Sequence, residues 1–380
     1  MKLGFETTEI CKGEKNHLKD MWLTVIIPAY EVAGYIAKCL QSIALQCDGL
    51  ACGIEVIVID DGSLDDSGKI ADAFAMKYPF IRVIHKNNEG VAAARNAGIE
   101  QASGEWLYFV DSDDWMAENA LEKLYQRRQD YANADIVLLD AYRNMENKEY
   151  SWEHFHEERI WHDKREIEQL QIGALYFPLA GKENKNPLAA PWDKLFRREF
   201  VLDYKLRFQE RLKVLDDMIF CMEAFGKAKR IVYCKEKVYH YRYVPNSITN
   251  SYKPSRVDQD RKVWEYIQKY IKKQVSGHLW GQEEKECFEE ALYCRIIKSY
   301  SICCRLCFFN PANKRKTKDK IAYALHVLTT EPYAEAFQKA HMRNLEWKLK
   351  VMAFMGKLKW GKGIYLLHLL ESSFGKWLKA

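Results

Sequence analysis

The sequence lacks the apolar runs that carry a chain into or across a membrane. None of its stretches approaches the roughly 18 consecutive apolar residues that a membrane span needs. Residues 1–20 are polar and contain no apolar signal core, so we expect residues 1–22 to form an N-terminal extension rather than a signal peptide. These absences predict a protein that works in the cytoplasm.

The signs of a zinc site and of a nucleic-acid partner are also missing. The 11 cysteines are scattered, and the CxxC pair of Cys304 and Cys307 has no second pair with which to complete a zinc site. Reduced thiols that act as small hydrophobic residues are therefore expected. A net charge of +5 is mild for 380 residues and does not argue for nucleic acid.

Two phosphate-binding loops are absent as well. No GxGxxG follows the first predicted strand, and the chain contains no GxxxxGK[ST]. Both loops place backbone N–H groups around a phosphate, so their absence weighs against a dinucleotide-dependent dehydrogenase and against a P-loop enzyme.

What the sequence does contain is an alternation of buried strands and helices. The predicted strands are 23–27, which Pro28 ends, 54–59, 81–84, 106–110 and 135–139. The predicted helices are 35–46, 66–77, 90–101 and 117–128. This order predicts an α/β fold with a mostly parallel central sheet flanked by helices. Ligands of such sheets collect beyond the carboxyl ends of the strands.

The strand that organises this half ends in a group of acids. Residues 106–110 are apolar or aromatic, and Asp111, Asp113 and Asp114 follow directly. Because unpaired charge is not tolerated inside a buried strand, the chain must open there onto solvent or a cation. The spacing of Asp111 and Asp113 suits Mn²⁺ or Mg²⁺. The alternative is an acidic turn that caps the helix expected from about Ala117.

Four ordered segments resemble the signature motifs of the family 2 glycosyltransferases, which have a GT-A (Rossmann-like) fold. They are Thr24–Tyr30 (TVIIPAY), Val58–Ser63 (VIDDGS), Asn88–Gly98 (NEGVAAARNAG) and Phe109–Asp114 (FVDSDD). The resemblance implies that a sugar is transferred from a nucleoside diphosphate, here UDP, to an acceptor hydroxyl.

The resemblance also implies a donor site. In it, Asp60 would accept a hydrogen bond from the uracil ring N–H, and a metal on Asp111 and Asp113, the DXD motif, would bridge the two phosphates. The expected nucleotide-binding residues are Pro28, Ala29, Tyr30, Glu31, Asp60, Asp61, Gly62, Ser63, Lys86, Gly90, Arg95, Asp111 and Ser112. The alternatives are a helix cap for Asp60 and a surface ion pair for Arg95.

Further elements match the family in the second half of the domain. Residues 191–198 resemble its W-x-K-L-[FY]-[RK] element, in which Trp192 could stack on a sugar and Lys194 could reach a phosphate. Core packing is the alternative for Trp192. The pattern at 238–249 resembles its Y-x-Y-R tail, so His240 and Arg242 are candidates for diphosphate contacts, with a structural role for His240 as the alternative.

Asp217 is the predicted catalytic base. Residues 215–220 resemble the E-D-x-x-F element of the family, with Asp216 where glutamate is usual. An inverting transfer needs one carboxylate to take the proton of the acceptor hydroxyl, and a neighbouring carboxylate with partial burial would raise its pKa. Asp216 remains an alternative base, and both acids could instead cap the helix over 218–227.

The remaining segments carry fewer signals. Residues 143–164, with several histidines, are expected to form a mobile, insert-like loop rather than a metal site. From 253 onward we expect helices over 257–273, 282–308, 316–329 and 333–380. In the last of these, apolar residues at helical spacing alternate with lysines, which is typical of a helix at a membrane surface and also of one packed on the catalytic domain.

These patterns together predict an inverting, metal-dependent hexosyltransferase with a glycosyltransferase domain over 23–252, divided at 140/141, and a helical region over 253–380. Its acceptor would be a glycan or lipid-linked saccharide in cell-surface or capsular polysaccharide synthesis, at the inner face of the cell membrane. One rival is a GT-A scaffold that binds nucleotide sugar without turnover. A nucleotidyltransferase would need a Gly-rich basic loop where Pro28–Glu31 stands.

Overall fold

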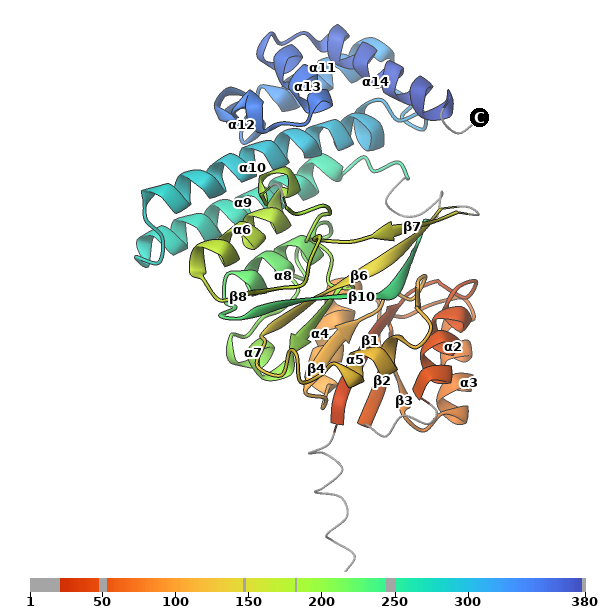
Figure 1. Cartoon of the computed structure of the whole chain (residues 1–380). Coiled ribbons are helices and arrows are strands. Elements are labelled where there is room, and N and C mark those ends of the chain that lie inside the picture. The colour runs from red at the N-terminus through yellow and green to blue at the C-terminus, as the bar shows by residue number, and fades with distance from the viewer. Residues whose placement is uncertain (1–20, 48–52, 146–147, 182, 244–250, 378–380) are drawn as a thin grey trace, which may run out of the picture. The chain divides into compact units, whose positions relative to one another are not determined.

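The chain forms two compact units in the computed structural model, which describes residues 21–47, 53–145, 148–181, 183–243 and 251–377 (Figure 1). The first unit comprises Met1–Ile167, Ala190–Glu210 and Lys227–Tyr243, and the second comprises Glu168–Ala189, Arg211–Gly226 and Val244–Ala380. Two segments expected in the first domain, 168–189 and 211–226, therefore belong with the C-terminal helices.

A 10-stranded sheet forms the centre of the first unit. Its main path runs β3-β2-β1-β4-β9-β6-β10-β5, and β7 and β8 pair with β6 and β10. The strands are β1 (Met21–Ala29), β2 (Gly53–Asp60), β3 (Ile81–His85), β4 (Trp106–Phe109), β5 (Trp115–Met116), β6 (Ile136–Met145), β7 (Lys148–Trp152), β8 (Arg159–Trp161), β9 (Lys194–Arg197) and β10 (Ile231–Arg242).

The first four of these strands in the chain form the predicted parallel half of the sheet, with β1 between β2 and β4. One boundary differs, because β1 continues through Pro28 to Ala29. The carbonyl of Ile26 accepts from Val110 N on the β4 side. Pro28, two residues on, faces the same side beyond the last pairing with β4, so its missing N–H removes no ladder bond.

The other half of the sheet is mixed. Strand β9, which the sequence did not predict, lies antiparallel between β4 and β6. Strand β10 is one irregular strand parallel to β6, where two strands were expected. The segment expected as an insert-like loop carries β7 and β8, and within it His154 is fully buried with Nε2 2.9 Å from Asp193 Oδ2. That histidine is a structural residue.

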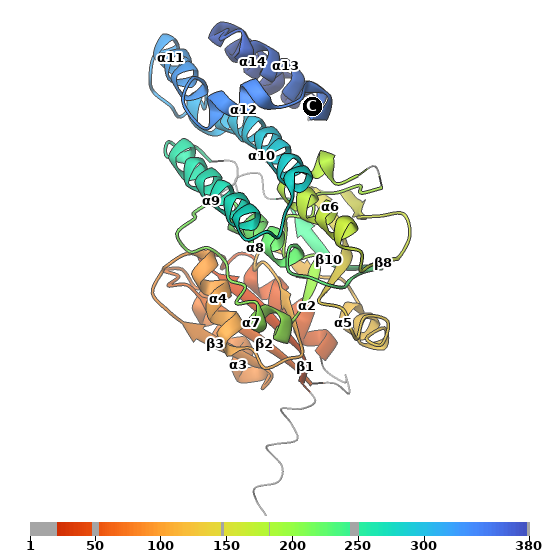
Figure 2. The ribbon, with the colours of Figure 1, turned by 90° about the vertical axis from the view of Figure 1, so that its left-hand side faces the viewer.

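Helices cover both faces of the parallel half, as the alternation of its side chains requires (Figure 2). Val25 and Val56 pack in one core with α2 (Ile36–Cys47), α3 (Ser67–Lys77) and α5 (Ala120–Gln126). Ile57 and Ile59 pack on the opposite face against Ala94 of α4 (Val91–Gln101). The short α7 (Arg198–Asp203) follows β9. Burial on both faces explains the continuous apolar runs of these strands.

Gly98 tests the close packing of α4 on β1. A Cβ at this position would overlap Ile26 Cγ2, whereas a Cβ on Gly34 would meet nothing within 4 Å. Gly98→Ala is therefore expected to lower the free energy of unfolding by about 1–3 kcal/mol, because overpacking a core strains it. Gly34→Ala is the matched control and should be nearly neutral. Urea denaturation monitored by circular dichroism measures both, and equal stabilities would contradict this packing.

The second unit is helical. Its elements are α6 (Lys164–Leu175), which begins in the first unit, η1 (Phe177–Leu179), α8 (Asp216–Phe225), α9 (Arg256–Ser276), α10 (Gln282–Cys303), the π-helix η2 (Cys304–Phe308), α11 (Thr317–Leu328), α12 (Tyr333–Lys339), η3 (Met342–Asn344), α13 (Trp347–Lys357) and α14 (Gly361–Trp377). The single helix expected from Tyr333 onward is thus broken into several. Among the described residues, none of the helices is long and apolar enough to cross a bilayer.

Candidate active site

The polar ends of the parallel strands meet at one edge of the first unit. Parallel pairing sets Ala29 beside Asp60, and Asp60 beside His85. On the other side of β1, Ile26 is level with Phe109, and Asp111 follows two residues later. The segments that follow β1, β2, β3 and β4 therefore start at the same edge, as the sequence predicted for a ligand site.

The turn after β4 is held by bonds from distant elements. Asp114 N donates to the carbonyl of Asp111 at 3.0 Å, which closes the turn. The Tyr239 hydroxyl accepts from Asp111 N at 3.1 Å and donates to Asp114 Oδ2 at 2.6 Å. The backbone N–H of Arg242 donates to Asp114 Oδ1 at 2.6 Å. Asp114 is thus a buried anchor, and the side chains of Asp111 and Asp113 remain partly exposed.

Crowding of three carboxylates gives this turn its electrostatic character. Burial, and then the charge of Asp111, raise the pKa of Asp113 to about 6. Burial raises the pKa of Asp114 well above its ordinary value, and Asp111 and Asp113 add to that effect. Anions held together in this way are stabilised by an added cation.

The donor set fits a hard divalent ion that is bound mainly through its substrate. Among the described residues, no three His, Cys, Asp or Glu side chains come together as a complete metal site. Asp111 and Asp113 would therefore supply only part of a coordination shell. Mg²⁺ and similar ions are often bound by one or two carboxylates, with substrate phosphates and water as the other ligands.

Arg95 lies beside these carboxylates. Its Nη2 is 2.9 Å from Asp111 Oδ1, and its guanidinium stacks over Phe208 at 5.1 Å. The residue is only 6% exposed, so the predicted alternative of a surface ion pair does not describe it. Guanidinium groups pair with carboxylates and with phosphates alike, so Arg95 is among the residues that could contact a diphosphate.

Asp60 is held by a histidine that the sequence reasoning did not use. Asp60 Oδ2 lies 2.8 Å from His85 Nδ1, and the other ring nitrogen lies 3.0 Å from Asp72 Oδ1. Ser63 N donates to Asp60 Oδ1 at 3.1 Å. The hydrogen bonds to Asp60 and then to Asp72 raise the pKa of His85. Asp60 could accept the uracil N–H only through lone pairs that these bonds leave free.

This bridge gives a direct prediction about His85. Asp72→Asn should lower the pKa of His85 toward its ordinary value, because the ring loses an anionic partner while Asp60 remains. The His85 ring resonance, followed by NMR across pH, measures the change. Asp66→Asn, which removes a carboxylate paired with Lys69 instead, is the matched control. An unchanged His85 titration in Asp72→Asn would contradict the bridge.

Asp61 shapes the loop after β3 and is itself buried. Its Oδ1 lies 2.9 Å from Lys86 Nζ, and its Oδ2 accepts from Gly90 N at 2.7 Å. At Gly62, where φ is +75°, a Cβ would lie 2.8 Å from Asn88 N. Ser63 Oγ in turn accepts from Glu31 N at 3.1 Å. These contacts join the predicted nucleotide-binding loops to one another, and they give Asp61 and Lys86 structural roles.

The remaining loop residues lie at the same edge with different exposure. Tyr30 is 40% exposed, which leaves its ring available to a base or ribose, whereas Ala29 and Ser112 are buried. Pro28 and Ala29 are the last residues of β1.

Three of the residues predicted to touch acceptor or diphosphate make packing contacts. Lys194 is fully buried, and its ammonium donates to the Ala190 carbonyl at 2.6 Å and to Asp193. The Trp192 ring stacks on Tyr239 at 4.8 Å. The His240 ring is stacked on Trp115 at 4.9 Å and on another aromatic ring. The structure favours the packing alternative for Trp192, and it leaves Lys194 no free path to a phosphate. His240 is stacked but only half-buried, and it lines the hollow described below.

Arg242, the last residue of β10, does reach the turn formed by Asp111–Asp114, which we call the carboxylate turn. Its Nε donates to the Asp113 carbonyl at 2.7 Å. Its guanidinium lies over the rings of Tyr35 and Trp115, at 5.1 and 4.7 Å. Arg242 therefore fixes the backbone of Asp113, and its charge offsets a part of the rise in the pKa of that carboxyl. Tyr239, which bonds the same turn, was missed. Its only sequence signal was its place on the strand that carries Arg242.

A hollow opens in the first unit just past this turn. It has a volume of about 820 Å³ and lies among α2, β5 and β10. Lys38, Gln41, Trp115, Glu118 and Lys123 are among the residues that line it. The mixture of amide, charged and aromatic groups is polar enough for a hydrated ligand such as a saccharide.

The predicted base residues belong to the second unit. Asp216 and Asp217 are the first residues of α8, where acids are stabilised by the helix dipole. Asp217 Oδ1 accepts from Met218 N at 2.7 Å, and Asp216 is 7% exposed. In the same unit, burial lowers the pKa of Arg295, while the charges of Asp260 and Asp217 oppose that effect. The helix-capping alternative is thus compatible with Asp217 and does not exclude a proton-transfer role.

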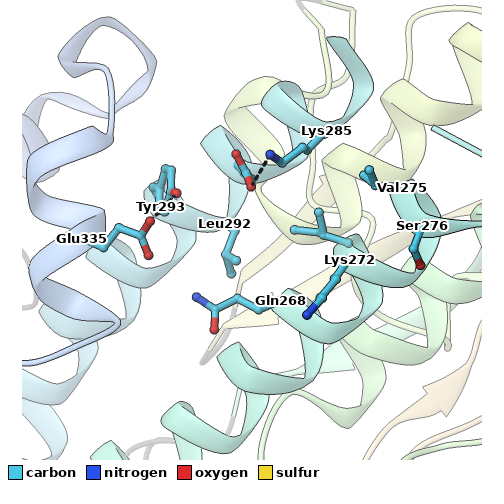
Figure 3. Close-up of a pocket in the computed structure, with 10 residues that line it drawn as sticks. Gln268, Lys272, Val275, Ser276, Lys285, Leu292, Tyr293 and Glu335 are labelled. Carbon is cyan, nitrogen blue, oxygen red and sulfur yellow. Dashed lines mark hydrogen bonds and ion pairs between the residues drawn. The ribbon is translucent and has the colours of Figure 1, made fainter. Parts of the chain in front are cut away.

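A second cavity lies within the second unit, between α9, α10 and α12 (Figure 3). It has a volume of about 400 Å³ and an apolar floor that includes Ile271 and Leu292. An ion pair between Lys285 and Glu289 and a hydrogen bond from Tyr293 to a glutamate flank it. None of the predicted site residues lines this cavity, so we assign it no part in the site above.

Comparison with known proteins points to one family. The sequence model described as "Glycosyl transferase family 2" matches residues 24–201. The chain is 34% identical over 229 residues to "Glycosyltransferase GlyG" of Streptococcus pneumoniae serotype 4, which covers 60% of this chain and 72% of that protein. It is 31% identical over 235 residues to "Uncharacterized glycosyltransferase EpsJ" of Bacillus subtilis, covering 61% of this chain and 64% of EpsJ.

A solved structure shares the fold over nearly the whole chain. It is that of S. aureus TarS 1-349 in complex with UDP, with a TM-score of 0.59 and 20% identity. The similarity covers 93% of this chain and 92% of that one. At this identity the match shows the fold alone, including the combination of a GT-A domain with a helical C-terminal region.

Proposed function

Because the chain belongs to the family 2 glycosyltransferases, we propose that it transfers a sugar from a UDP-sugar to an acceptor hydroxyl with inversion at the anomeric carbon. The observation that carries the proposal is the carboxylate turn at the edge of the parallel sheet. There the partly exposed Asp111 and Asp113 lie beside the buried Arg95. A diphosphate and a divalent ion are the partners that such a mixed set of charges would hold.

Asp111 and Asp113 would hold the ion, Mn²⁺ or Mg²⁺. When bound, it neutralises the charge that grows on the departing diphosphate. Two arginines of the chain would assist. Arg95 offers a buried guanidinium to the phosphates, and Arg242 fixes the Asp113 backbone. Because these groups are positioned before the substrate arrives, little reorganisation is needed when the bond breaks.

The base that we propose is Asp217, with Asp216 as the alternative. It takes the proton of the acceptor hydroxyl as that oxygen attacks from the face opposite the diphosphate. Asp217 lies in the first turn of α8, where the helix dipole favours an acidic side chain. A carboxylate in this role contributes roughly 10²–10⁴ in rate.

The acceptor that we propose is a glycan or a lipid-linked saccharide in cell-surface or capsular polysaccharide synthesis. The enzyme would act in the cytoplasm at the inner face of the cell membrane. The family resemblance supports this setting.

Release of UDP from a set of UDP-sugars tests the proposal. Wild-type protein should release UDP slowly in Mn²⁺ buffer even without acceptor, because water can replace the hydroxyl, and EDTA should stop the release. A protein that binds UDP-sugars but never releases UDP, with or without oligosaccharide acceptors, would be the non-catalytic scaffold instead. Release that persists in EDTA would contradict the role of Asp111 and Asp113.

A further inference from the structure

The stretch from Trp347 to Leu370 combines two properties that are rarely found together on a free surface. It contains five lysines and neither Asp nor Glu over its whole length. Seven of its large hydrophobic side chains are nevertheless exposed. Large apolar side chains that are exposed in such number along one segment often mark an interaction site.

Helix α13 has two opposite apolar faces. Leu349, Met352 and Ala353 are buried, and a Cβ on Gly356 would overlap the Phe337 ring of α12, so this face packs inside the second unit. The opposite face carries Trp347, Phe354 and Leu358, which are 68, 58 and 60% exposed. Residues at these spacings share one side of a helix with 3.6 residues per turn.

The lysines of α13 lie along the borders of the exposed face. At 3.6 residues per turn, Lys350 and Lys357 fall on one border between the two apolar faces, and Lys348 falls on the other. This arrangement lets their aliphatic stems lie along apolar surface while the ammonium groups point to water or to anions.

The same pattern continues into α14. Its residue Gly361 packs on Ile321 and Leu325 of α11, so this side of the helix is buried. Leu366, Leu369 and Leu370 are exposed at helical spacing, with Lys362 one turn before them. Trp360, which is 50% exposed, stands between the two helices. One face of each helix thus packs within the second unit, and the other face is exposed.

We propose that the exposed side of Trp347–Leu370 is a docking surface for an anionic lipid bilayer. Its Trp, Phe and Leu side chains enter the boundary between headgroups and acyl chains, and its lysines pair with the acidic headgroups. Helices that lie in a membrane surface are rich in Lys on the polar side and in Trp, Phe and Leu on the other. A protein partner is disfavoured because lysine is depleted from protein interfaces.

The docking surface is inferred from α13 and α14 alone, but its purpose rests on the proposed function. Docking would hold the enzyme where a lipid-linked acceptor is found. Docking of this kind needs no membrane-spanning helix, and none was found among the described residues.

Sedimentation of the full chain with lipid vesicles tests the surface. Wild-type protein should bind vesicles of equal parts phosphatidylglycerol and phosphatidylcholine, and should bind pure phosphatidylcholine vesicles at least tenfold more weakly. Replacing Lys348, Lys350, Lys357 and Lys359 by Gln should reduce binding to the anionic vesicles at least tenfold, since each lysine near such a surface contributes about fivefold. The double variant Phe354→Ser, Leu358→Ser should reduce binding to a similar extent.

Matched controls distinguish binding through this surface from effects of net charge or of exposed hydrophobic side chains in general. Replacing Lys262, Lys269, Lys314 and Lys318 by Gln makes the same change in net charge elsewhere in the second unit. Leu279→Ser changes another exposed leucine of that unit, 54% exposed. Both controls should bind vesicles like wild type.

Three results would overturn the proposal. They are failure of the wild-type chain to bind anionic vesicles, equal losses in the variants and their controls, and a dimer in solution that only the Phe354→Ser, Leu358→Ser variant breaks. UDP-dependent thermal stabilisation is measured on the same samples. If UDP fails to stabilise the protein while vesicles still bind, the proposed function is wrong and the surface stands.

Discussion

Asp113→Asn is expected to lower kcat/KM for the UDP-sugar by about 10²–10³-fold. This is the loss typical of removing one enzyme group that stabilises charge in the transition state. The neutral amide is a weaker ligand for a hard cation, so the loss should appear chiefly as a higher Mn²⁺ requirement. The fold should remain, because Asp114, not Asp113, accepts the hydrogen bonds from Tyr239 and Arg242 that anchor the turn. Steady-state release of UDP across Mn²⁺ concentrations measures the effect.

Asp203→Asn is the control for this change. Asp203 is an exposed aspartate of the first unit at the end of α7, and it is not among the proposed site residues. It should leave both activity and Mn²⁺ requirement as in wild type. If Asp113→Asn retained full activity at the wild-type Mn²⁺ concentration, the carboxylate turn would be structural rather than metal-binding.

Asp217→Asn is expected to lower kcat by roughly 10²–10⁴-fold while leaving the affinity for UDP unchanged. The amide cannot take a proton from the acceptor, but it can still cap α8 by accepting from Met218 N. Turnover with acceptor and UDP binding by calorimetry are therefore measured on the same preparation. Asp216→Asn, made in parallel, decides between the two neighbours.

Asp258→Asn is the matched control for the base. Asp258 is an exposed acid in the first turn of α9, so it shares the helix-dipole role of Asp217 without a proposed part in chemistry. A similar small effect of Asp217→Asn and Asp258→Asn would reduce Asp217 to a helix cap. A large loss in Asp216→Asn alone would move the base by one position.

The parallel half of the sheet could be predicted because its signals are local. Strands such as 54–59 are buried on both faces, so burial shows directly as a continuous apolar run. Strand β9 could not be predicted in this way. It lies within Pro191–Arg198, where Lys194 and two arginines interrupt the pattern, and only its position between β4 and β6 makes it a strand.

The candidate site was predictable where residues follow strand ends and not where distant elements meet. Asp60 and Asp111 are placed by the parallel register alone. The bond from His85 to Asp60 and those from Tyr239 to the carboxylate turn depend on tertiary contacts that no motif encodes. Lys194 shows the converse, because a basic residue in a family motif proves to be buried and internally bonded.

Calorimetric titration of UDP in the presence and absence of Mn²⁺ tests the central claim most directly, namely that the carboxylate turn holds a divalent ion together with a uridine diphosphate. The account predicts that Mn²⁺ tightens UDP binding at least tenfold in wild type, and that Asp111→Asn and Asp113→Asn lose this gain. Binding of UDP with equal affinity in Mn²⁺ and in EDTA, or binding of a guanosine or thymidine diphosphate but not of UDP, would contradict it.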